Sequence, residues 1–198
     1  TANNPLPNGT DTYIWSRGDG NDTINDWSHS TIEVDTLVLT DVIASEVALS
    51  RSNNSNDLRI SIAGTPSVEA ITVNSRFYSV SEGYGIERIV FSDGAIWTLQ
   101  DILARTRLDG TTTGDALTGI AYRDNLFGLA GNDTLTGNDG DDVLVGGAGN
   151  DSLVGGNGSD IYEWQRGEGN DTINEAGTVA GEIDTLILKD VVSTGSVL

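Results

Sequence analysis

Cysteine and methionine are absent from this chain of 198 residues, and aromatic and cationic residues are scarce. Without cysteine the chain cannot form a disulfide, although that absence alone does not identify its compartment. Ten Lys and Arg residues stand against 30 Asp and Glu residues, a formal net charge of −20, which argues against nucleic acid as a partner. With so few aromatic residues, we expect the core to consist of thin layers of Leu, Ile and Val.

Long apolar runs are also lacking, so the sequence predicts no membrane span. No signal-peptide pattern opens the chain as given. Its single histidine, His29, would have to serve any Ser-His-Asp site. A longer internal repeat, described below, places Thr178 at the position equivalent to His29. The sequence therefore predicts no catalytic site, and the chain is not expected to be an enzyme.

Between Gly110 and Glu163 the sequence repeats every nine residues. The six segments are GTTTGDALT, GIAYRDNLF, GLAGNDTLT, GNDGDDVLV, GGAGNDSLV and GGNGSDIYE. Each begins with Gly, has Asp at its sixth place and carries a large apolar residue after it. The pattern GGxGxDxUx predicts a parallel β-roll, in which six residues form a tight turn and three form a short strand. The Asp supplies the turn with a hard anionic oxygen, which suits a hard cation such as calcium.

These nonapeptides resemble the repeats-in-toxin (RTX, haemolysin-type) calcium-binding family. The resemblance implies an all-β fold, a parallel β-roll plus a small β-rich capping segment with one short helix. It also implies calcium bound between stacked turns, and a secreted, extracellular protein exported by a type I route. Two nonapeptides make one turn of such a roll, so alternate repeats should stack. Repeats that start at 110, 128 and 146 then form one side, and those that start at 119, 137 and 155 form the other.

The resemblance, carried over position by position, makes the sixth-place carboxylates the candidate calcium ligands. They are Asp115, Asp124, Asp133, Asp142, Asp151 and Asp160, and Asp171 continues the series after a two-residue offset. Backbone carbonyls would come from the turns at Gly131, Gly140, Gly149, Gly158 and Gly169, with support from the fifth-place residues Asn132, Asp141 and Asn150. An isolated Asp more often makes an Asx turn, whereas a phased series favours a metal.

The first two repeats depart from the pattern. Repeat 110–118 lacks Gly at its second and fourth places, and the next repeat has Ile120 and Tyr122 there. We therefore expect weaker sites at Asp115 and Asp124, and these two repeats are more typical of an entry cap.

A longer repeat relates residues 8–42 to residues 157–191, at an offset of 149 and with 20 identities in 35 places. The chain is then a window across a tandem array, with four expected parts: 1–26, the end of a preceding block; 27–104, a β-rich flanking segment; 105–175, the roll; and 176–198, the truncated start of the next flank. Asp11 and Asp22 match Asp160 and Asp171, so they are candidate ligands too. The repeats that should stack beneath them are mostly missing, so a complete site would need another part of the chain or another molecule.

Alternation and β-branching predict five strands in the flanking segment. They are Val34–Leu39, Leu58–Ile62, Ala70–Val73, Ile86–Phe91 and Ile96–Thr98. Thr98-Leu99-Gln100-Asp101 predicts a capped start to a short helix that runs to about Arg105. The arrangement resembles the segment that follows repeat blocks in haemolysin-type proteins and in the adenylate cyclase toxin, which implies that it closes the open end of a roll.

Calcium-dependent folding and structural support is the function that these features favour. The alternative is a binding module, in which the flank contacts a polysaccharide or a cell surface, as in the repeat modules of mannuronan epimerases or in large adhesins. An exposed row of aromatic residues on 33–104 would favour that alternative. Trp15 and Trp164 occupy equivalent places and are expected to pack rather than to stack on sugars.

Two further expectations concern partners. The open ends of the array suggest head-to-tail self-association, against the alternative that 33–104 folds back and caps 110–174 within one chain. Arg17-Gly18-Asp19 spells the integrin-binding tripeptide, but the second copy reads Arg166-Gly167-Glu168. The spelling therefore follows from the repeat, and adhesion through it is not predicted.

Overall fold

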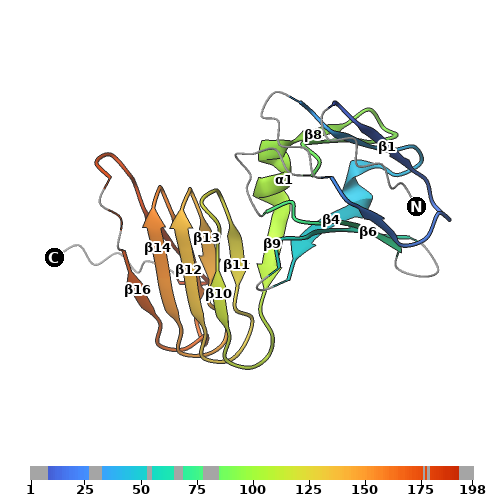
Figure 1. Cartoon of the computed structure of the whole chain (residues 1–198). Coiled ribbons are helices and arrows are strands. Elements are labelled where there is room, and N and C mark those ends of the chain that lie inside the picture. Colours follow the sequence, from blue (N-terminus) through green and yellow to red (C-terminus); the bar gives the residue numbers. More distant parts are fainter. Residues whose placement is uncertain are drawn as a thin grey trace. The chain divides into compact units, whose positions relative to one another are not determined.

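A computed structural model of the chain describes residues 9–26, 33–52, 55–64, 69–77, 85–175, 177 and 179–191; His29 lies outside them. The chain folds into two compact units, Thr1–Arg107 and Leu108–Leu198, called unit 1 and unit 2 (Figure 1). Strands dominate the described residues of both units, which include one short α-helix, in unit 1. Within the described residues, no helix has the length and apolar character that a membrane crossing requires.

Unit 1 is built from two sheets, a 3-10 turn and the helix. Its elements are β1 (Thr12–Trp15), β2 (Asp22–Ile24), β3 (Thr36–Leu39), η1 (Ala44–Glu46), β4 (Val47–Arg51), β5 (Leu58–Ile62), β6 (Glu69–Val73), β7 (Arg88–Val90), β8 (Ile96–Thr98) and α1 (Leu99–Arg105). The first sheet has the order β1-β3-β7-β8, in which only the β7–β8 pair is antiparallel. In the second sheet β4, β5 and β6 form an antiparallel meander, and β2 joins β6 in parallel.

Alternation along the strands places the core of unit 1 between these two sheets (Figure 1). In β5, Leu58, Ile60 and Ile62 are buried while Arg59 between them is exposed. The helix contacts β8 and β4 and contributes its own buried apolar residues. Each fully buried Leu or Ile side chain stabilises the fold by about 1.5–3 kcal/mol relative to exposure, so the sheets hold together through this layer.

The sequence predicted most of this segment correctly. Strands β5 and β8 have the expected bounds, and α1 starts after Thr98 and ends at Arg105. The Thr98 hydroxyl accepts a hydrogen bond from the Asp101 N–H, and Asp101 Oδ2 accepts one from the Thr98 N–H, which is the expected cap. Strand β4 was not predicted, because its sequence VALSR has weak apolar alternation. Pairing with β5, a tertiary contact, stabilises it as a strand.

Unit 2 is a parallel β-roll. Its strands are β10 (Ala116–Thr118), β11 (Asn125–Phe127), β12 (Thr134–Asp139), β13 (Val143–Val145), β14 (Ser152–Asn157), β15 (Ile161–Gln165), β16 (Thr172–Asn174) and β17 (Thr185–Lys189), preceded by β9 (Thr106–Asp109) at the boundary of the units. One sheet has the order β10-β12-β14-β16, and β11, β13, β15 and β17 follow one another in the other. All of these neighbours are parallel, as the nonapeptides predict.

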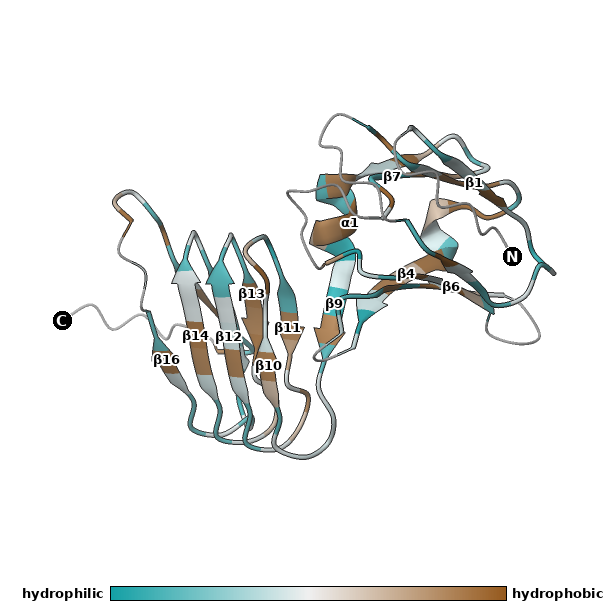
Figure 2. Cartoon of the chain, viewed as in Figure 1, coloured by the Kyte–Doolittle hydropathy of each residue, from teal (hydrophilic) through white to brown (hydrophobic). Residues whose placement is uncertain are grey.

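The register confirms that one turn of the roll takes two nonapeptides. Leu117 pairs with Leu135 and then Leu153, and Leu126 pairs with Leu144 and then Tyr162. These six side chains and Leu108 form one buried cluster inside the roll. Figure 2 shows the resulting apolar band across β10, β12 and β14. The next pairing, Leu153 with Ile173, is two residues longer, which confirms the predicted offset.

The turns of the roll stack backbone on backbone, which is why they require glycine. Gly147 has φ +93°, and a Cβ there would collide with the Leu129 carbonyl oxygen in the turn below. At Gly156, with φ +117°, a Cβ would collide with the Asn138 carbonyl oxygen. Other residues combine positive φ with steric conflict at such positions, so glycine is needed for both reasons.

Comparison of the two repeat copies shows what the flanking segment does. In unit 1, Ile24, Leu37 and Leu39 are at most 4% exposed, because the flanking strands cover them. Their equivalents in unit 2, Ile173, Leu186 and Leu188, are 38–50% exposed. The flanking segment of unit 1 therefore buries an apolar face that a roll end otherwise presents to water.

Candidate metal sites

The sixth-place aspartates of the roll form two ladders, one on each side. On one side the backbone N–H of Asp115 donates to Asp133 Oδ1 at 2.8 Å, and the Asp133 N–H donates to Asp151 Oδ1 at 2.8 Å. On the other side the Asp124 N–H donates to Asp142 Oδ1 at 2.7 Å, and that of Asp142 to Asp160 Oδ1 at 2.9 Å. Each carboxylate thus uses one oxygen to hold the turn beneath it.

The second oxygen of these carboxylates is the unusual feature. The Oδ2 atoms of Asp133, Asp142, Asp151 and Asp160 are buried and have no hydrogen-bond partner in the part of the chain that the structure describes. The four side chains are at most 3% exposed. A buried anionic oxygen without a partner is costly unless a proton or a cation neutralises it. Four such atoms recur at one repeat position, so the folded roll contains four buried oxygens that protons or cations would have to neutralise.

The first two repeats differ at this same atom. Asp115 Oδ2 accepts hydrogen bonds from the N–H and hydroxyl of Thr111, at 2.6 and 2.8 Å. Asp124 Oδ2 accepts one from the Ile120 N–H at 2.6 Å. Their strands nevertheless belong to the regular roll, and Leu117 and Leu126 are buried in its core. These repeats are therefore ordinary coils rather than a separate cap, but their carboxylates are already satisfied by local donors.

The glycines of the turn shape the space around each unpartnered oxygen. A Cβ at the first place, as at Gly137 or Gly155, would collide with the Oδ2 of Asp142 or Asp160 in the same repeat. The predicted fourth-place glycines stack in pairs: Gly131 under Gly149, Gly140 under Gly158, and Gly149 under Gly169. A Cβ on the upper glycine of each pair would collide with the carbonyl oxygen of the lower one. A Cβ at Gly137 would lie close to both Asp142 Oδ2 and the Gly155 carbonyl oxygen, so carboxylate and carbonyl oxygens occur together there, and calcium prefers this donor set. These residues fit a bound calcium ion.

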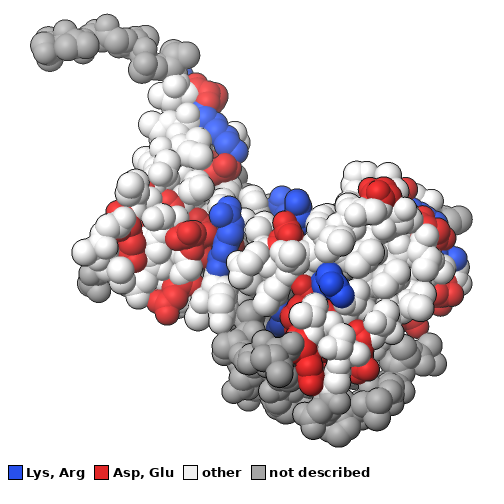
Figure 3. All heavy atoms as spheres, turned by 90° about the horizontal axis from the view of Figure 1, so that it is seen from above, with Lys and Arg blue, Asp and Glu red and all other residues white. Residues whose placement is uncertain are grey.

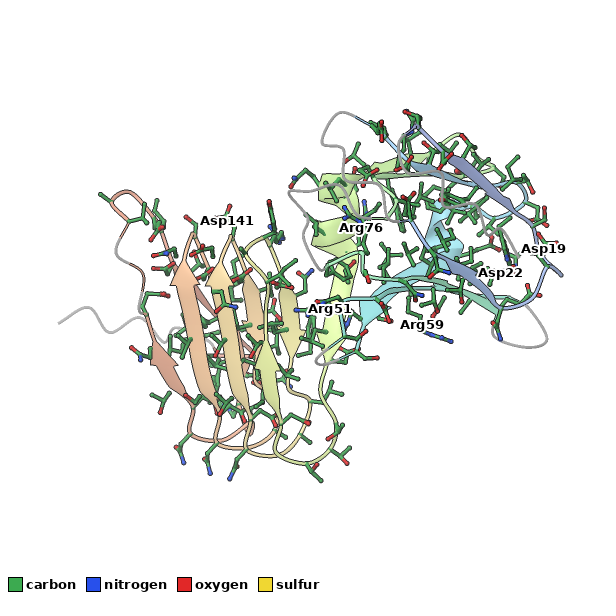
Figure 4. All side chains as sticks on the ribbon, in the orientation of Figure 1. Asp19, Asp22, Arg51, Arg59, Arg76 and Asp141 are labelled. Carbon is green, nitrogen blue, oxygen red and sulfur yellow. The ribbon has the colours of Figure 1, made fainter. Side chains whose placement is uncertain are left out.

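The fifth-place residues have a supporting role in the turns. Asn132 Oδ1 accepts the Asn150 N–H at 2.9 Å, and Asn150 Oδ1 accepts the Asn170 N–H at 2.9 Å. On the other side Asp141 Oδ1 accepts the Ser159 N–H at 2.8 Å. Asp141 lies in a turn at one end of the strands (Figure 4). These bonds run from turn to turn outside the aspartate ladders, so they align the stacked turns.

Each ladder continues past the last nonapeptide through a residue with a different spacing. Asp171 Oδ1 accepts the Asp151 N–H at 2.9 Å, as the predicted two-residue offset requires. Asp184 Oδ1 accepts the Asp160 N–H at 3.0 Å, 24 residues away. Asp160, Glu175 and Asp184 bring one carboxylate oxygen each within 4.8 Å of one another. Glu175 and Asp184 were not predicted from the sequence, although the long repeat aligns them with Asp26 and Asp35.

The two candidates of unit 1 have different surroundings. The Asp11 N–H donates to Asp35 Oδ1 at 2.6 Å, the same bond that Asp160 makes with Asp184. Asp22 begins β2 and is paired in register with Ile71 of β6, so a flanking strand stands where a roll would place another coil. Asp19 and Asp22, both labelled in Figure 4, line the same pocket of unit 1. The residue beside Asp22 on this strand is therefore Ile71 rather than another aspartate.

Burial dominates the electrostatics of the ladders. Desolvation raises the pKa of Asp142 to about 8, against the hydrogen bond from Asp124, and the nearby carboxylates of Asp124 and Asp160 raise it further. Burial likewise raises the pKa of Asp160 to about 6. The pKa values of Asp133 and Asp151 are raised for the same primary reason. In the metal-free roll these groups favour folding when protonated, and this contribution is lost as the pH rises through the raised pKa values.

Calcium and protons should therefore compete for the buried carboxylates of the roll. Lowering the pH from 8 to 5.5 protonates Asp142 and part of Asp160, so we expect the calcium midpoint of folding to rise several-fold. Calcium titrations followed by circular dichroism at the two pH values measure this. Because protons also relieve the metal-free repulsion, the amplitude of the calcium response should be smaller at pH 5.5. A midpoint that stays constant or falls would contradict the competition.

Comparison with known proteins agrees with this geometry. The model of the RTX calcium-binding nonapeptide repeat matches at 109–144, 118–153 and 136–163. Residues 109–163 are RTX calcium-binding repeats. The model of the haemolysin-type calcium binding protein related domain matches residues 57–101, so the resemblance seen in the flanking segment is confirmed as well. RTX repeats bind calcium, which identifies the ligand class of this chain.

Solved structures and curated sequences say less about this chain than the family models do. The chain is similar to the extracellular lipase LipA from Serratia marcescens, with 18% identity and a TM-score of 0.34. The alignment covers 94% of this chain and 31% of the lipase chain, so the chain spans about a third of that protein. No curated protein sequence matches it. The RTX assignment therefore depends on the repeats and on the roll that they form.

Proposed function

We propose that this RTX module folds when calcium fills the sites between its stacked turns, and that it serves as a structural part of a secreted protein. This proposal is based on the buried, unpartnered Oδ2 atoms of Asp133, Asp142, Asp151 and Asp160. In it, these four carboxylates bind calcium together with carbonyl oxygens of the fourth-place glycines. Acidic side chains are scattered over the face of both units that Figure 3 shows, and the net charge of −20 adds repulsion that cations relieve.

The free energy of calcium binding is large enough to switch the chain from unfolded to folded. A site with a Kd of about 0.1 mM, at roughly millimolar free calcium, stabilises the folded state by about 1.4 kcal/mol. Four such sites together contribute about 6 kcal/mol, which compares with a total stability of about 5–15 kcal/mol for an ordinary domain. At much lower calcium this contribution disappears, while the glycine-rich chain still loses its conformational entropy on folding. The chain would then remain unfolded before export and fold outside the cell.

Secretion and the lack of catalysis belong to the same proposal. RTX repeats are typical of secreted proteins and are usually non-catalytic calcium-binding units. We therefore assign this chain a location outside the cell, with export by a type I route, and a structural rather than an enzymatic role. The activity of a longer protein that contained it would depend on other segments.

The described aromatic residues favour structural support over sugar binding. In 33–104, the described aromatic side chains of Phe77, Phe91 and Trp97 are at most 8% exposed. Trp15 is 3% exposed, which confirms the packing expected of it, and its equivalent Trp164 is partly exposed beside Leu186 and Leu188. The exposed aromatic row that a polysaccharide surface would need is not present among these residues. Neither carbohydrate binding nor head-to-tail association gains support from the comparisons.

Calcium-driven folding can be tested on the chain itself. In excess chelator, far-UV circular dichroism should show a largely disordered spectrum for the roll, and β-signal should appear as calcium is added. Magnesium should substitute poorly, because it requires near-octahedral geometry and gives up its water reluctantly. A spectrum that stays the same throughout the calcium titration would rule the proposal out.

A further inference from the structure

Three carboxylates converge in unit 1, outside the nonapeptide repeats. Asp11 precedes β1, Asp26 follows β2 and Asp35 precedes β3. One carboxylate oxygen of each lies within 4.8 Å of the others. The parallel register of β1 and β3 pairs Thr12 with Thr36, which sets the first and the last of these residues side by side. Asp26 and Asp35 are only 3% and 1% exposed, so the cluster is largely removed from water.

One atom of this cluster lacks a partner. Asp35 Oδ1 accepts the Asp11 N–H at 2.6 Å, but Asp35 Oδ2 is buried without a hydrogen bond in the described part of the chain. The carboxylates of Asp26 and Asp11 are close enough to act on Asp35 as like charges. The Tyr13 hydroxyl donates to Asp26 Oδ2 at 3.0 Å, which orients that carboxylate. A buried carboxylate group of this kind is costly unless a proton or a cation neutralises it.

The surrounding groups make the negative charge larger. The Asp35 N–H donates to Glu87 Oε2 at 2.8 Å, and Glu87 Oε1 is buried without a hydrogen-bond partner in the described residues. Arg76 is near enough to act electrostatically on Glu87, so that carboxylate has a countercharge. A cation would therefore bind the carboxylates of the three aspartates rather than that of Glu87.

We propose that Asp11, Asp26 and Asp35 bind a calcium ion within unit 1. All the donors are carboxylate oxygens, which hard cations prefer. Two oxygens on one calcium ion can be separated by about 4.6–5.2 Å, twice the calcium–oxygen distance of about 2.3–2.6 Å, whereas magnesium permits about 4.2 Å at most. The three oxygens of the cluster lie within 4.8 Å of one another, a separation that a calcium ion can span. The ion would join β1, β3 and the chain after β2, and its site contains no residue of the nonapeptide ladders.

The second repeat copy contains the same arrangement. Asp160, Glu175 and Asp184 stand 149 residues after the three aspartates of unit 1, and their carboxylate oxygens also lie within 4.8 Å of one another. The Tyr162 hydroxyl donates to Glu175 Oε2 at 2.6 Å, as Tyr13 does to Asp26. In this copy Glu175 and Asp184 are exposed. Both copies thus combine a tyrosine, three carboxylates and a parallel strand pair, but the cluster of unit 1 is the more buried.

Hydrogen exchange with mass spectrometry on the full chain tests this site, because it follows each unit separately. With calcium, amides of β1 and β3 in the wild-type chain should gain protection by at least about tenfold. Asp35→Asn keeps the oxygen that accepts the Asp11 N–H but removes the charge. In chelator this variant should protect β1 and β3 at least as well as the wild type does, and added calcium should raise that protection no further. Native mass spectrometry should then count one calcium ion fewer.

The matched control is Asp133→Asn, which should weaken the calcium response of β12 and β14 and leave that of β1 and β3 unchanged. Asp26→Asn provides the same comparison if the Asp35 variant does not fold. The proposed site would be overturned if calcium did not change the hydrogen exchange of unit 1 amides in the wild type. An equal calcium response of these amides in the Asn variants would overturn it as well. Equal protection by magnesium would overturn its assignment to calcium. Because roll peptides are read in the same experiment, failure of this site is distinguishable from failure of calcium-driven folding in the roll.

Discussion

Gly147→Ala should prevent the roll from folding at calcium concentrations that suffice for the wild type. Gly147 has φ +93°, and an added Cβ would collide with the Leu129 carbonyl oxygen. That oxygen accepts a hydrogen bond from the Ala148 N–H at 2.9 Å, one of the bonds that stack the turns. Relief of the collision would separate neighbouring coils, and with them the oxygens that we propose to bind calcium. We expect the calcium midpoint to rise at least about tenfold, or no folded state at 10 mM calcium (a concentration of roughly a hundred times the Kd of about 0.1 mM).

Gly167→Ala is a matched control for this variant. Gly167 has the same φ of +93°, but nothing lies within 4 Å of the position of an added Cβ. Its cost is then the backbone strain alone, about 1 kcal/mol, which corresponds to a shift of about fivefold or less in the midpoint. Calcium titrations followed by circular dichroism compare the two variants. Similar shifts would show that conformational strain, rather than the close approach of stacked turns, explains the need for glycine.

Asp151→Asn should raise the calcium midpoint of the roll by at least about tenfold, the range that even supporting residues of a metal site reach. Asp151 Oδ1 accepts the Asp133 N–H, and an Asn side chain can still accept it, so the turn remains in place. The lost charge is that of the buried Oδ2 atom, which has no hydrogen-bond partner in the described residues. The effect of this variant therefore reports on the cation rather than on the hydrogen bond.

Asp115→Asn is the control, since Asp115 occupies the same place in its repeat. Its Oδ2 accepts hydrogen bonds from the N–H and hydroxyl of Thr111, so little need for a cation remains there. We expect a change of less than about threefold, because partial loss of hydrogen bonds at an exposed turn costs about 0.5 kcal/mol. Isothermal titration calorimetry of the two variants gives both affinity and stoichiometry. Equal losses would show that unpartnered oxygens do not mark the strong sites.

A calcium ion in unit 1 would change how the whole chain depends on calcium. The repeats occur in unit 2, yet unit 1 contains a buried carboxylate cluster of its own. Its strands also cover the apolar face formed by Ile24, Leu37 and Leu39. An ion that joins β1 to β3 would stabilise the sheet that carries two of these three side chains. Calcium would then support both the roll and the segment that closes such a roll.

The nonapeptide period by itself determined the roll, its two ladders of aspartates and the turns that hold them. This was possible because each coil repeats a local pattern, and stacking every 18 residues follows from two repeats per turn. Even the offset before β16 and the cap of α1 were visible, since both depend on a few neighbouring residues. The match between residues 8–42 and 157–191 also showed that the same unit occurs twice.

The departures of the first two repeats already predicted weaker sites at Asp115 and Asp124, but only the tertiary structure showed the atomic reason. Asp115 and Asp133 occupy the same place in the pattern, yet local donors satisfy the second oxygen of Asp115 and leave that of Asp133 without a partner. The cluster of Asp11, Asp26 and Asp35 forms only when β1 and β3 pair across 24 residues. Spacing along the chain does not encode such distances, because they depend on how separate strands fold against one another and exclude water.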